Sequence, residues 1–230
     1  MNLIFQLRYS IPKKDFRNGL IDLVFKWVKN DKEVENCKYV QKSKNTLESF
    51  KRNNYLQALI INGDLSEISY YEYCSYLNLN FINIPSSVKY IGTGAFTECK
   101  YLKKIIIPEG VTHILDSTFS HCYRLEEVKI PKSVAIINTC AFYLCRYLKR
   151  LEIPFGVKII GEKSFGHCYN LKHVVISLSV KSISPRAFYM CKKIETITIP
   201  KRFQSQIKEI FNNIDINNVE ITYIQKCKQR

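Results

Sequence analysis

Residues 107–129 read IPEGVTHILDSTFSHCYRLEEVK, and the same pattern of side chains returns every 23 residues between positions 84 and 199. The pattern places Phe119, Cys122 and Leu125 three residues apart. Its counterparts occur without an insertion: phenylalanine at 96, 119, 142, 165 and 188, and cysteine at 99, 122, 145, 168 and 191. Copies held in phase over this length indicate a repeat protein, in which each unit buries its apolar face by stacking on the next.

The repeating unit predicts one short strand and one return arm. It runs Ile-Pro-x-x-Val-x-x-Ile-x-x-x-Ala-Phe-x-x-Cys-x-x-Leu-x-x-Ile-x. Leu102, Ile105 and Ile107 include the alternation of a strand with one buried face, and Pro108 ends that strand because it has no N–H for the ladder. The three-residue spacing of the stretch from valine to cysteine predicts a short helical or 3₁₀ return arm. Stacked units then make a parallel sheet with one strand per repeat.

The unit Ile107–Ile114, followed by Phe119, Cys122 and Leu125, resembles the BspA-like class of leucine-rich repeat, which has this length and an Ala-Phe-x-x-Cys-x-x-Leu signature. The resemblance is strong over residues 85–200 and weak over residues 56–84. It implies an α/β repeat fold: a leucine-rich-repeat solenoid with one short parallel strand per 23-residue repeat. It also implies a binding function and no catalytic residues.

The residues before the repeats are expected to fold differently. Residues 1–55 do not repeat, and apolar residues at helical spacing predict an amphipathic helix over Asp15–Lys29. Asn45 or Thr46 is placed to cap a second helix. Because a solenoid exposes apolar surface at each end, residues 1–55 are interpreted as a helical N-terminal cap or, alternatively, as a small interaction region.

The solenoid is expected to span residues 56–200, with a degenerate first copy over 56–84 and clean copies over 85–200. In the degenerate copy, residues 71–77 resemble the Phe-x-x-Cys-x-x-Leu segment, with about two extra residues after it. Residues 201–230 are expected to form a C-terminal cap. There, a helical stripe of Phe203, Ile207, Ile210 and Phe211 precedes a strand predicted over Val219–Ile224.

The cysteines are predicted to be structural. The chain holds nine, an odd number, without a secretory signal, which argues against a disulfide framework. Five form what we name the cysteine column: Cys99, Cys122, Cys145, Cys168 and Cys191. One thiol per repeat lies in a line and does not converge on a zinc ion, so we expect buried, reduced thiols and no metal or other cofactor. His121 and His167 each precede a column cysteine, and both imidazoles are expected to face solvent.

Composition and motifs exclude several classes of protein. The sequence has no nucleophile elbow and no glycine-rich phosphate loop, so no catalytic residues are expected. No stretch approaches the roughly 20 apolar residues of a membrane span, and Met1–Arg8 lacks a secretory signal, so an intracellular, cytoplasmic protein is expected. The net charge of +15 is spread along the chain. A protein is the favoured partner, and a polyanion, either nucleic acid or an anionic membrane surface, is the alternative.

The expected partner-binding surface is the outer face of the sheet. If Ile105 and Ile107 are buried, Lys104 and Ile106 point outward, and their counterparts form two ladders. One ladder runs Phe81, Lys104, Glu127, Arg150, His173 and Thr196, and the other runs Asn83, Ile106, Lys129, Glu152, Val175 and Thr198. Opposite charges in the first ladder also favour stacking of the repeats, which is an alternative role. A rim of Tyr101, Tyr123, Tyr147 and Tyr169 among lysines and arginines is expected to complete the surface, since tyrosine and arginine are favoured at protein contacts.

Overall fold

The computed structural model describes residues 38–42, 56–61 and 65–225. The chain divides into two units, Met1–Cys37 and Lys38–Arg230, and all the described residues belong to the second. The helices predicted over Asp15–Lys29 and after Asn45 or Thr46 lie outside the described residues.

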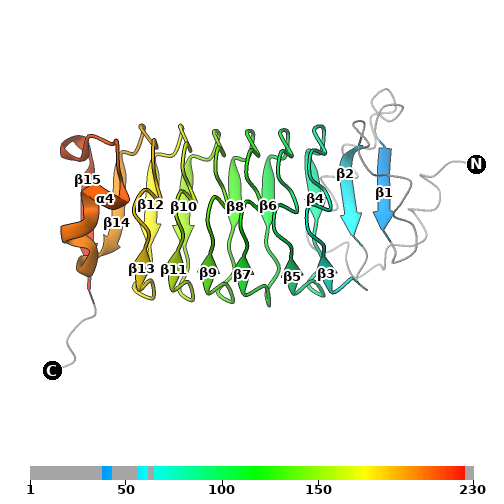
Figure 1. Cartoon of the computed structure of the whole chain (residues 1–230), viewed down its shortest axis with the longest axis horizontal. Helices are drawn as coiled ribbons and strands as arrows, with labels where there is room; N and C mark the ends of the chain where they lie inside the picture. Colours follow the sequence, from blue (N-terminus) through cyan, green and yellow to red (C-terminus); the bar gives the residue numbers. More distant parts are fainter. Residues whose placement is uncertain (1–37, 43–55, 62–64, 226–230) are drawn as a thin grey trace, which may run out of the picture. The chain divides into compact units, whose positions relative to one another are not determined.

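One row of parallel strands holds the outward ladders. Its strands are β1 (Lys38–Lys42), β2 (Leu56–Ile61), β4 (Phe81–Asn83), β6 (Lys104–Ile106), β8 (Glu127–Lys129), β10 (Arg150–Ile153), β12 (His173–Ile176), β14 (Thr196–Pro200) and β15 (Glu220–Ile224). They lie side by side along the solenoid (Figure 1) and pair in three groups, β1-β2-β4, β6-β8 and β10-β12-β14-β15. Between β6 and β14 the paired residues are one repeat apart, as Arg150 and His173 are. The parallel strand predicted in each repeat is confirmed, but it is not the only strand of the repeat. Strand β1, which pairs with β2, was not predicted.

The return arms differ from the prediction. Each begins with a two-residue strand, and these strands form a second row: β3 (Glu67–Ile68), β5 (Tyr90–Ile91), β7 (His113–Ile114), β9 (Ile136–Ile137), β11 (Ile159–Ile160) and β13 (Ser182–Ile183). Consecutive turns follow in place of the expected helix or 3₁₀ helix. The N–H of Phe96 donates to the carbonyl oxygen of Thr118 in the next repeat at 2.9 Å, whereas the N–H of Cys99 donates back to Phe96 at 3.2 Å. Bonds between repeats thus replace part of the local pattern that a helix requires.

Left-handed backbone residues shape every arm. Two occur per repeat, four positions apart, and the second directly precedes the position of the column cysteine. In the third clean repeat they are Cys140 (φ 55°) and Leu144 (φ 62°). Non-glycine residues rarely adopt this conformation, so the regular packing of the repeats holds it in place.

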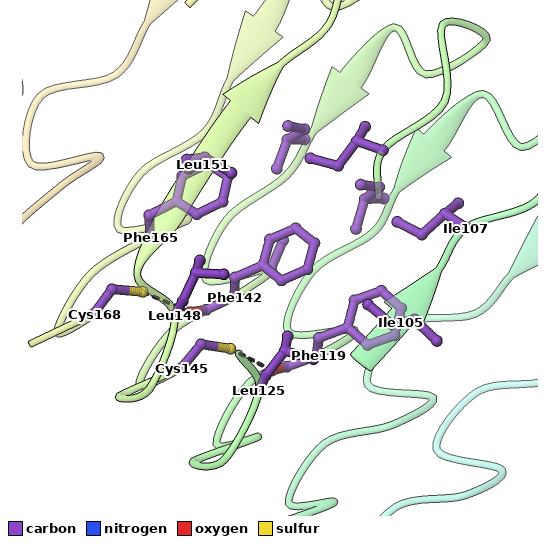
Figure 2. Packing of buried hydrophobic residues seen from close by; sticks show 14 of the residues in the cluster. Ile105, Ile107, Phe119, Leu125, Phe142, Cys145, Leu148, Leu151, Phe165 and Cys168 are labelled. Atoms are coloured by element: carbon purple, nitrogen blue, oxygen red, sulfur yellow. Dashed lines mark hydrogen bonds between the residues drawn. The ribbon is translucent and has the colours of Figure 1, made fainter. Parts of the chain in front are cut away.

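A stack of aromatic rings runs through the core. Tyr73, Phe96, Phe119, Phe142, Phe165, Phe188 and Phe211 lie face to face, with centroids 4.7 to 5.4 Å apart. Figure 2 shows three of these rings in line, with the column cysteines and the strand residues around them. All seven rings are buried. Stacked aromatic pairs contribute more stability than the area that they bury accounts for. The aromatic stack therefore fills the core and favours the alignment of each repeat with the next.

The first copy keeps the 23-residue spacing, and the prediction of extra residues within it is wrong. Tyr73 stacks on Phe96 at 5.4 Å, and Tyr76 and Leu79 are buried at the places that Cys99 and Leu102 occupy one repeat later. Two tyrosines fill the space of a phenylalanine and a cysteine, which hid the alignment in the sequence.

The C-terminal stripe packs against the last repeat. It forms η3 (Lys201–Gln206), a 3₁₀ helix, and the one-turn helix α4 (Ile207–Ile210). Phe203, Ile207 and Ile210 are buried, and Phe211 packs on Phe188 with centroids 4.7 Å apart. After η4 (Ile216–Asn218), strand β15 pairs with β14 along its whole length.

Candidate interaction surface

The outward ladders lie where the alternation of apolar and polar residues predicted. Lys104, Glu127 and Arg150 are exposed, and His173 is half-buried. In the second ladder Lys129 and Glu152 are exposed, Ile106 is half-buried and Val175 has an exposed fraction of 39%. The strand residues between the ladders, such as Ile105 and Leu151, are buried.

Two ion pairs join neighbouring repeats on this side of the solenoid. The ammonium of Lys104 lies 2.7 Å from a carboxylate oxygen of Glu127, and Lys172 lies 2.5 Å from Glu195. The lysine beside Glu195 lowers the pKa of that carboxyl. Among the described residues, Glu127 forms no ion pair with Arg150. The first ladder also has a hydrogen bond between repeats, in which Nδ1 of His173 lies 3.0 Å from the hydroxyl of Thr196. The guanidinium of Arg150 forms no ion pair within the described residues, which leaves it open to a partner.

The predicted tyrosine and basic residues come together along one edge of the solenoid. We name as the cation–tyrosine edge the two residues that follow each column cysteine: Lys100, Tyr101, Tyr123, Arg124, Arg146, Tyr147, Tyr169, Asn170, Lys192 and Lys193. The guanidinium carbon of Arg124 lies 4.7 Å from the ring centroid of Tyr101, and that of Arg146 lies 4.4 Å from Tyr123. Tyr101 and Tyr147 have exposed fractions of 41% and 48%. Such contacts orient the cations without neutralising them.

A second aromatic row lies just before the column cysteines and was not predicted. The ring centroid of Tyr143 lies 5.7 Å from that of His121 and 5.2 Å from that of His167. On the other side of His167, the ring centroid of Tyr189 lies 5.3 Å from that imidazole. Both imidazoles are half-buried, whereas the adjacent Cys122 and Cys168 are fully buried, so the predicted exposure of the histidines to solvent is only partial. The neighbouring tyrosine rings cover them. Because Tyr143 and Tyr189 are two repeats apart, the 23-residue pattern gave no signal for this row.

The protonation of these histidines follows from their surroundings. Burial lowers the pKa of His121 and of His167, and Arg146 lowers both further. The Nδ1 atom of His121 lies 2.8 Å from the hydroxyl of Ser120, and that of His167 lies 2.6 Å from the hydroxyl of Tyr169. The neutral imidazole, which can both donate and accept, fits this row of hydroxyl groups.

The cysteine column is buried and reduced, as predicted. Burial raises the pKa of the Cys122 and Cys145 thiols far above its usual range, which removes the reactive thiolate. No group of three or more His, Cys, Asp or Glu side chains that could hold a metal ion occurs within residues 38–42, 56–61 and 65–225. In the same part of the chain, no helix has the length and apolar character needed to cross a membrane.

Comparisons with known proteins agree with this geometry. A family model described as BspA type Leucine rich repeat region matches the chain in six copies, over residues 29–149 and 112–229. No curated protein sequence matches the chain.

Several solved structures are similar to the chain. A leucine-rich repeat protein from Bacteroides ovatus is 23% identical, with a TM-score of 0.48 over 75% of this chain and 55% of that one. This chain therefore spans about half the length of that protein. A leucine-rich repeat protein from T. pallidum is 19% identical, with a TM-score of 0.46 over 82% of this chain and 75% of the other. The pneumococcal vaccine antigen PcpA is 15% identical, with a TM-score of 0.43 over 74% and 68% of the respective chains.

Proposed function

Because this chain belongs to the BspA-type leucine-rich repeat family, we propose that it is a non-enzymatic scaffold that binds a protein partner on the outward ladders and the cation–tyrosine edge. Proteins of this family generally serve as interaction scaffolds. The observation that carries the proposal is the row of exposed Lys104, Glu127 and Arg150 on successive strands. The inward-facing residues of the same strands pack in the core.

The chemistry of this surface suits a protein partner. Each strand offers few outward side chains, so recognition must combine several repeats. Charged residues lie beside exposed apolar ones, as Glu152 lies beside Val175 in the paired strands. Interfaces that bind proteins mix apolar contacts with a polar rim and are enriched in tyrosine and arginine.

A pair of double variants tests the proposal. The intact chain is used to capture partners, which are identified by mass spectrometry, and the same capture is repeated with Lys104→Glu and Arg150→Glu combined. We expect the captured protein to be lost while the fold is kept, since an exposed ion pair such as Lys104–Glu127 contributes only about 0–1 kcal/mol. Circular dichroism checks the fold.

The matched control is Lys132→Glu combined with Lys181→Glu, which makes the same change in net charge. Both lysines are exposed and lie outside the ladders and the edge. Two other lysines outside the ladders and the edge are less suitable as controls. The ammonium of Lys89 donates to the carbonyl oxygens of Ser86 and Glu109, and that of Lys158 lies over the ring of Phe155. If neither double variant loses the partner, the proposed surface is wrong.

The alternative function is binding of a polyanion, either nucleic acid or an anionic membrane surface. The net charge of +15 favours it. Binding driven by counterion release weakens steeply with salt, and it should depend on bulk charge. Equal losses in the two double variants, together with a steep salt dependence, would favour this alternative over the scaffold.

A further inference from the structure

Cations and tyrosines alternate along the cation–tyrosine edge. The first residue after each column cysteine is in turn Lys100, Tyr123, Arg146, Tyr169 and Lys192, and the second is Tyr101, Arg124, Tyr147, Asn170 and Lys193. The order of cation and ring therefore inverts between the first and second repeats and again between the second and third, whereas the fourth repeat has no cation. Arg146 lies between two rings, 4.4 Å from the centroid of Tyr123 and 5.9 Å from that of Tyr169.

The backbone holds this arrangement in register. The N–H of Arg124 donates to the carbonyl oxygen of Lys100 at 3.1 Å, and the N–H of Tyr147 donates to that of Tyr123 at 3.1 Å. Asn170 repeats the bond to Arg146 at 3.2 Å through its N–H and adds a side-chain bond to the same oxygen at 2.8 Å. Side chains that are ordered in advance lose less entropy when a ligand binds.

The positive charge of the edge is left almost unpaired. The edge has five cations and no carboxylate. Lys100 lies 3.8 Å from Glu98, but neither Arg124 nor Arg146 forms an ion pair within the described part of the chain. Single carboxylates lie beside the edge: Glu98 comes before a column cysteine and Glu126 follows Leu125. In three other repeats the position of Glu126 is a lysine: Lys103, Lys149 and Lys172. The result is a positive strip that runs along this edge of the repeats.

We propose that this strip binds an extended, carboxylate-rich segment of the protein partner; the inference rests on the proposed function and names the chemistry of its ligand. A guanidinium that lies over a ring keeps its N–H groups free for a carboxylate, which it binds with two parallel hydrogen bonds. The cations Lys100, Arg124 and Arg146 in successive repeats align the ligand along the edge.

A nucleic acid fits this strip less well. Sequence-tolerant binding of single strands uses aromatic faces on which bases stack. Here cations already cover faces of Tyr101 and Tyr123.

The spacing of the cations defines the peptide. Repeats are about 4.8 Å apart and adjacent residues about 3.3 Å apart, which separates Arg124 from Arg146 by about 6 Å at the backbone. In an extended peptide, alternate side chains on one face are about 6.7 Å apart. Acidic residues at every second position therefore match Lys100, Arg124 and Arg146.

The experiment uses the intact chain and a fluorescein-labelled peptide of about 12 residues in which glutamate and serine alternate. A peptide of this length is longer than the roughly six extended residues that would span five repeats. Fluorescence anisotropy is measured at about 150 mM salt, where the Debye length is about 8 Å. We expect the peptide to bind, and the same peptide with glutamine for glutamate not to bind. Arg124→Gln combined with Arg146→Gln should weaken binding about tenfold or more.

Two further variants and one further probe make the result specific. Arg124→Lys with Arg146→Lys keeps the charge but loses the planar guanidinium groups, which can each donate two parallel hydrogen bonds to a carboxylate, so binding should also weaken. Lys132→Gln with Lys181→Gln should leave the Kd within about twofold, because these charges lie outside the strip. An oligouridine of equal charge should bind more weakly than the acidic peptide, since cations cover faces of Tyr101 and Tyr123.

Three results would overturn the inference: no peptide binding, equal losses from the arginine and lysine pairs, or tighter binding of oligouridine that depends on Arg124 and Arg146. The test is separate from that of the proposed function. If the peptide fails to bind while partner capture still depends on Lys104 and Arg150, the scaffold stands and only the acidic segment is wrong. If capture fails as well, both are wrong.

Discussion

The thiol of Cys145 donates a hydrogen bond to the backbone carbonyl oxygen of Phe119, in the preceding repeat, at 3.3 Å (Figure 2). The same bond recurs along the cysteine column, from Cys99 to Tyr73, Cys122 to Phe96, Cys168 to Phe142 and Cys191 to Phe165, at 3.0 to 3.5 Å. The column therefore links the repeats as well as filling space. An alanine would fill part of the volume but could not donate.

Cys145→Ala is expected to lower the free energy of unfolding by about 1–3 kcal/mol, because it leaves a buried carbonyl oxygen without this donor and opens a small void. Cys140→Ala should cost less than about 0.5 kcal/mol, since Cys140 is only half-buried. Denaturant unfolding compares the two. Equal costs would show that the thiol bond adds nothing to stability.

Thiol labelling should separate the cysteines by burial. In the native protein, Cys122, Cys145 and Cys168 are expected to react with an alkylating reagent far more slowly than Cys74, which is partly exposed. Burial blocks access and raises the pKa of the column thiols, so almost no thiolate is present. Site-resolved mass spectrometry after a short pulse gives the rates. Column thiols that react as fast as Cys74 would refute their structural role.

Phe142→Ala should destabilise the protein by about 3–5 kcal/mol, because the ring is buried between Phe119 and Phe165 at 5.3 Å from each. Tyr143→Ala should cost about 1–2 kcal/mol, since that ring is half-buried and meets the rings of His121 and His167 edge to face. Both values come from denaturant unfolding. A larger loss at Tyr143 than at Phe142 would contradict the packing described above.

Stability is expected to fall as pH falls from about 7.5 to about 5.5. Burial lowers the pKa of His121 and His167 in the folded state, so the unfolded chain binds more protons in this window and folding weakens on acidification. His121→Gln combined with His167→Gln should flatten the dependence. Urea unfolding at both pH values measures it, and an unchanged slope in the double variant would assign the effect to other groups.

Gly156→Ala should cost about 2–3 kcal/mol or more. Its φ of 133° is a conformation that alanine rarely adopts, and a Cβ atom there would meet the carbonyl oxygen of Lys132. Gly166→Ala is the control, because its Cβ would lie 3.1 Å from the ring of Tyr143, which can move. Thermal unfolding ranks the two, and a milder effect at Gly156 would exclude this contact.

The 23-residue pattern alone was enough to predict the solenoid, the strand of each repeat and the burial of residues such as Phe142 and Cys145. The reason is physical: a side chain that recurs at a fixed period must meet its own counterpart when identical units stack, so position in the repeat implies position in the core. The outward ladders followed from the same alternation, because Lys104 is adjacent to the buried Ile105.

Only the tertiary structure showed which residues accept the hydrogen bonds of the backbone N–H groups and which side chains pack against one another between repeats. The return arms are turns because the N–H of Phe96 reaches Thr118 in another repeat, a contact that local spacing does not contain. Tyr73 stacks on Phe96 although the motif there had degenerated. Likewise, Arg146 stacks on Tyr123 because the first residue after the column cysteine is a tyrosine in one repeat and an arginine in the next. Contacts between unlike residues of neighbouring repeats carry no periodic signal, so they are decided by packing in three dimensions.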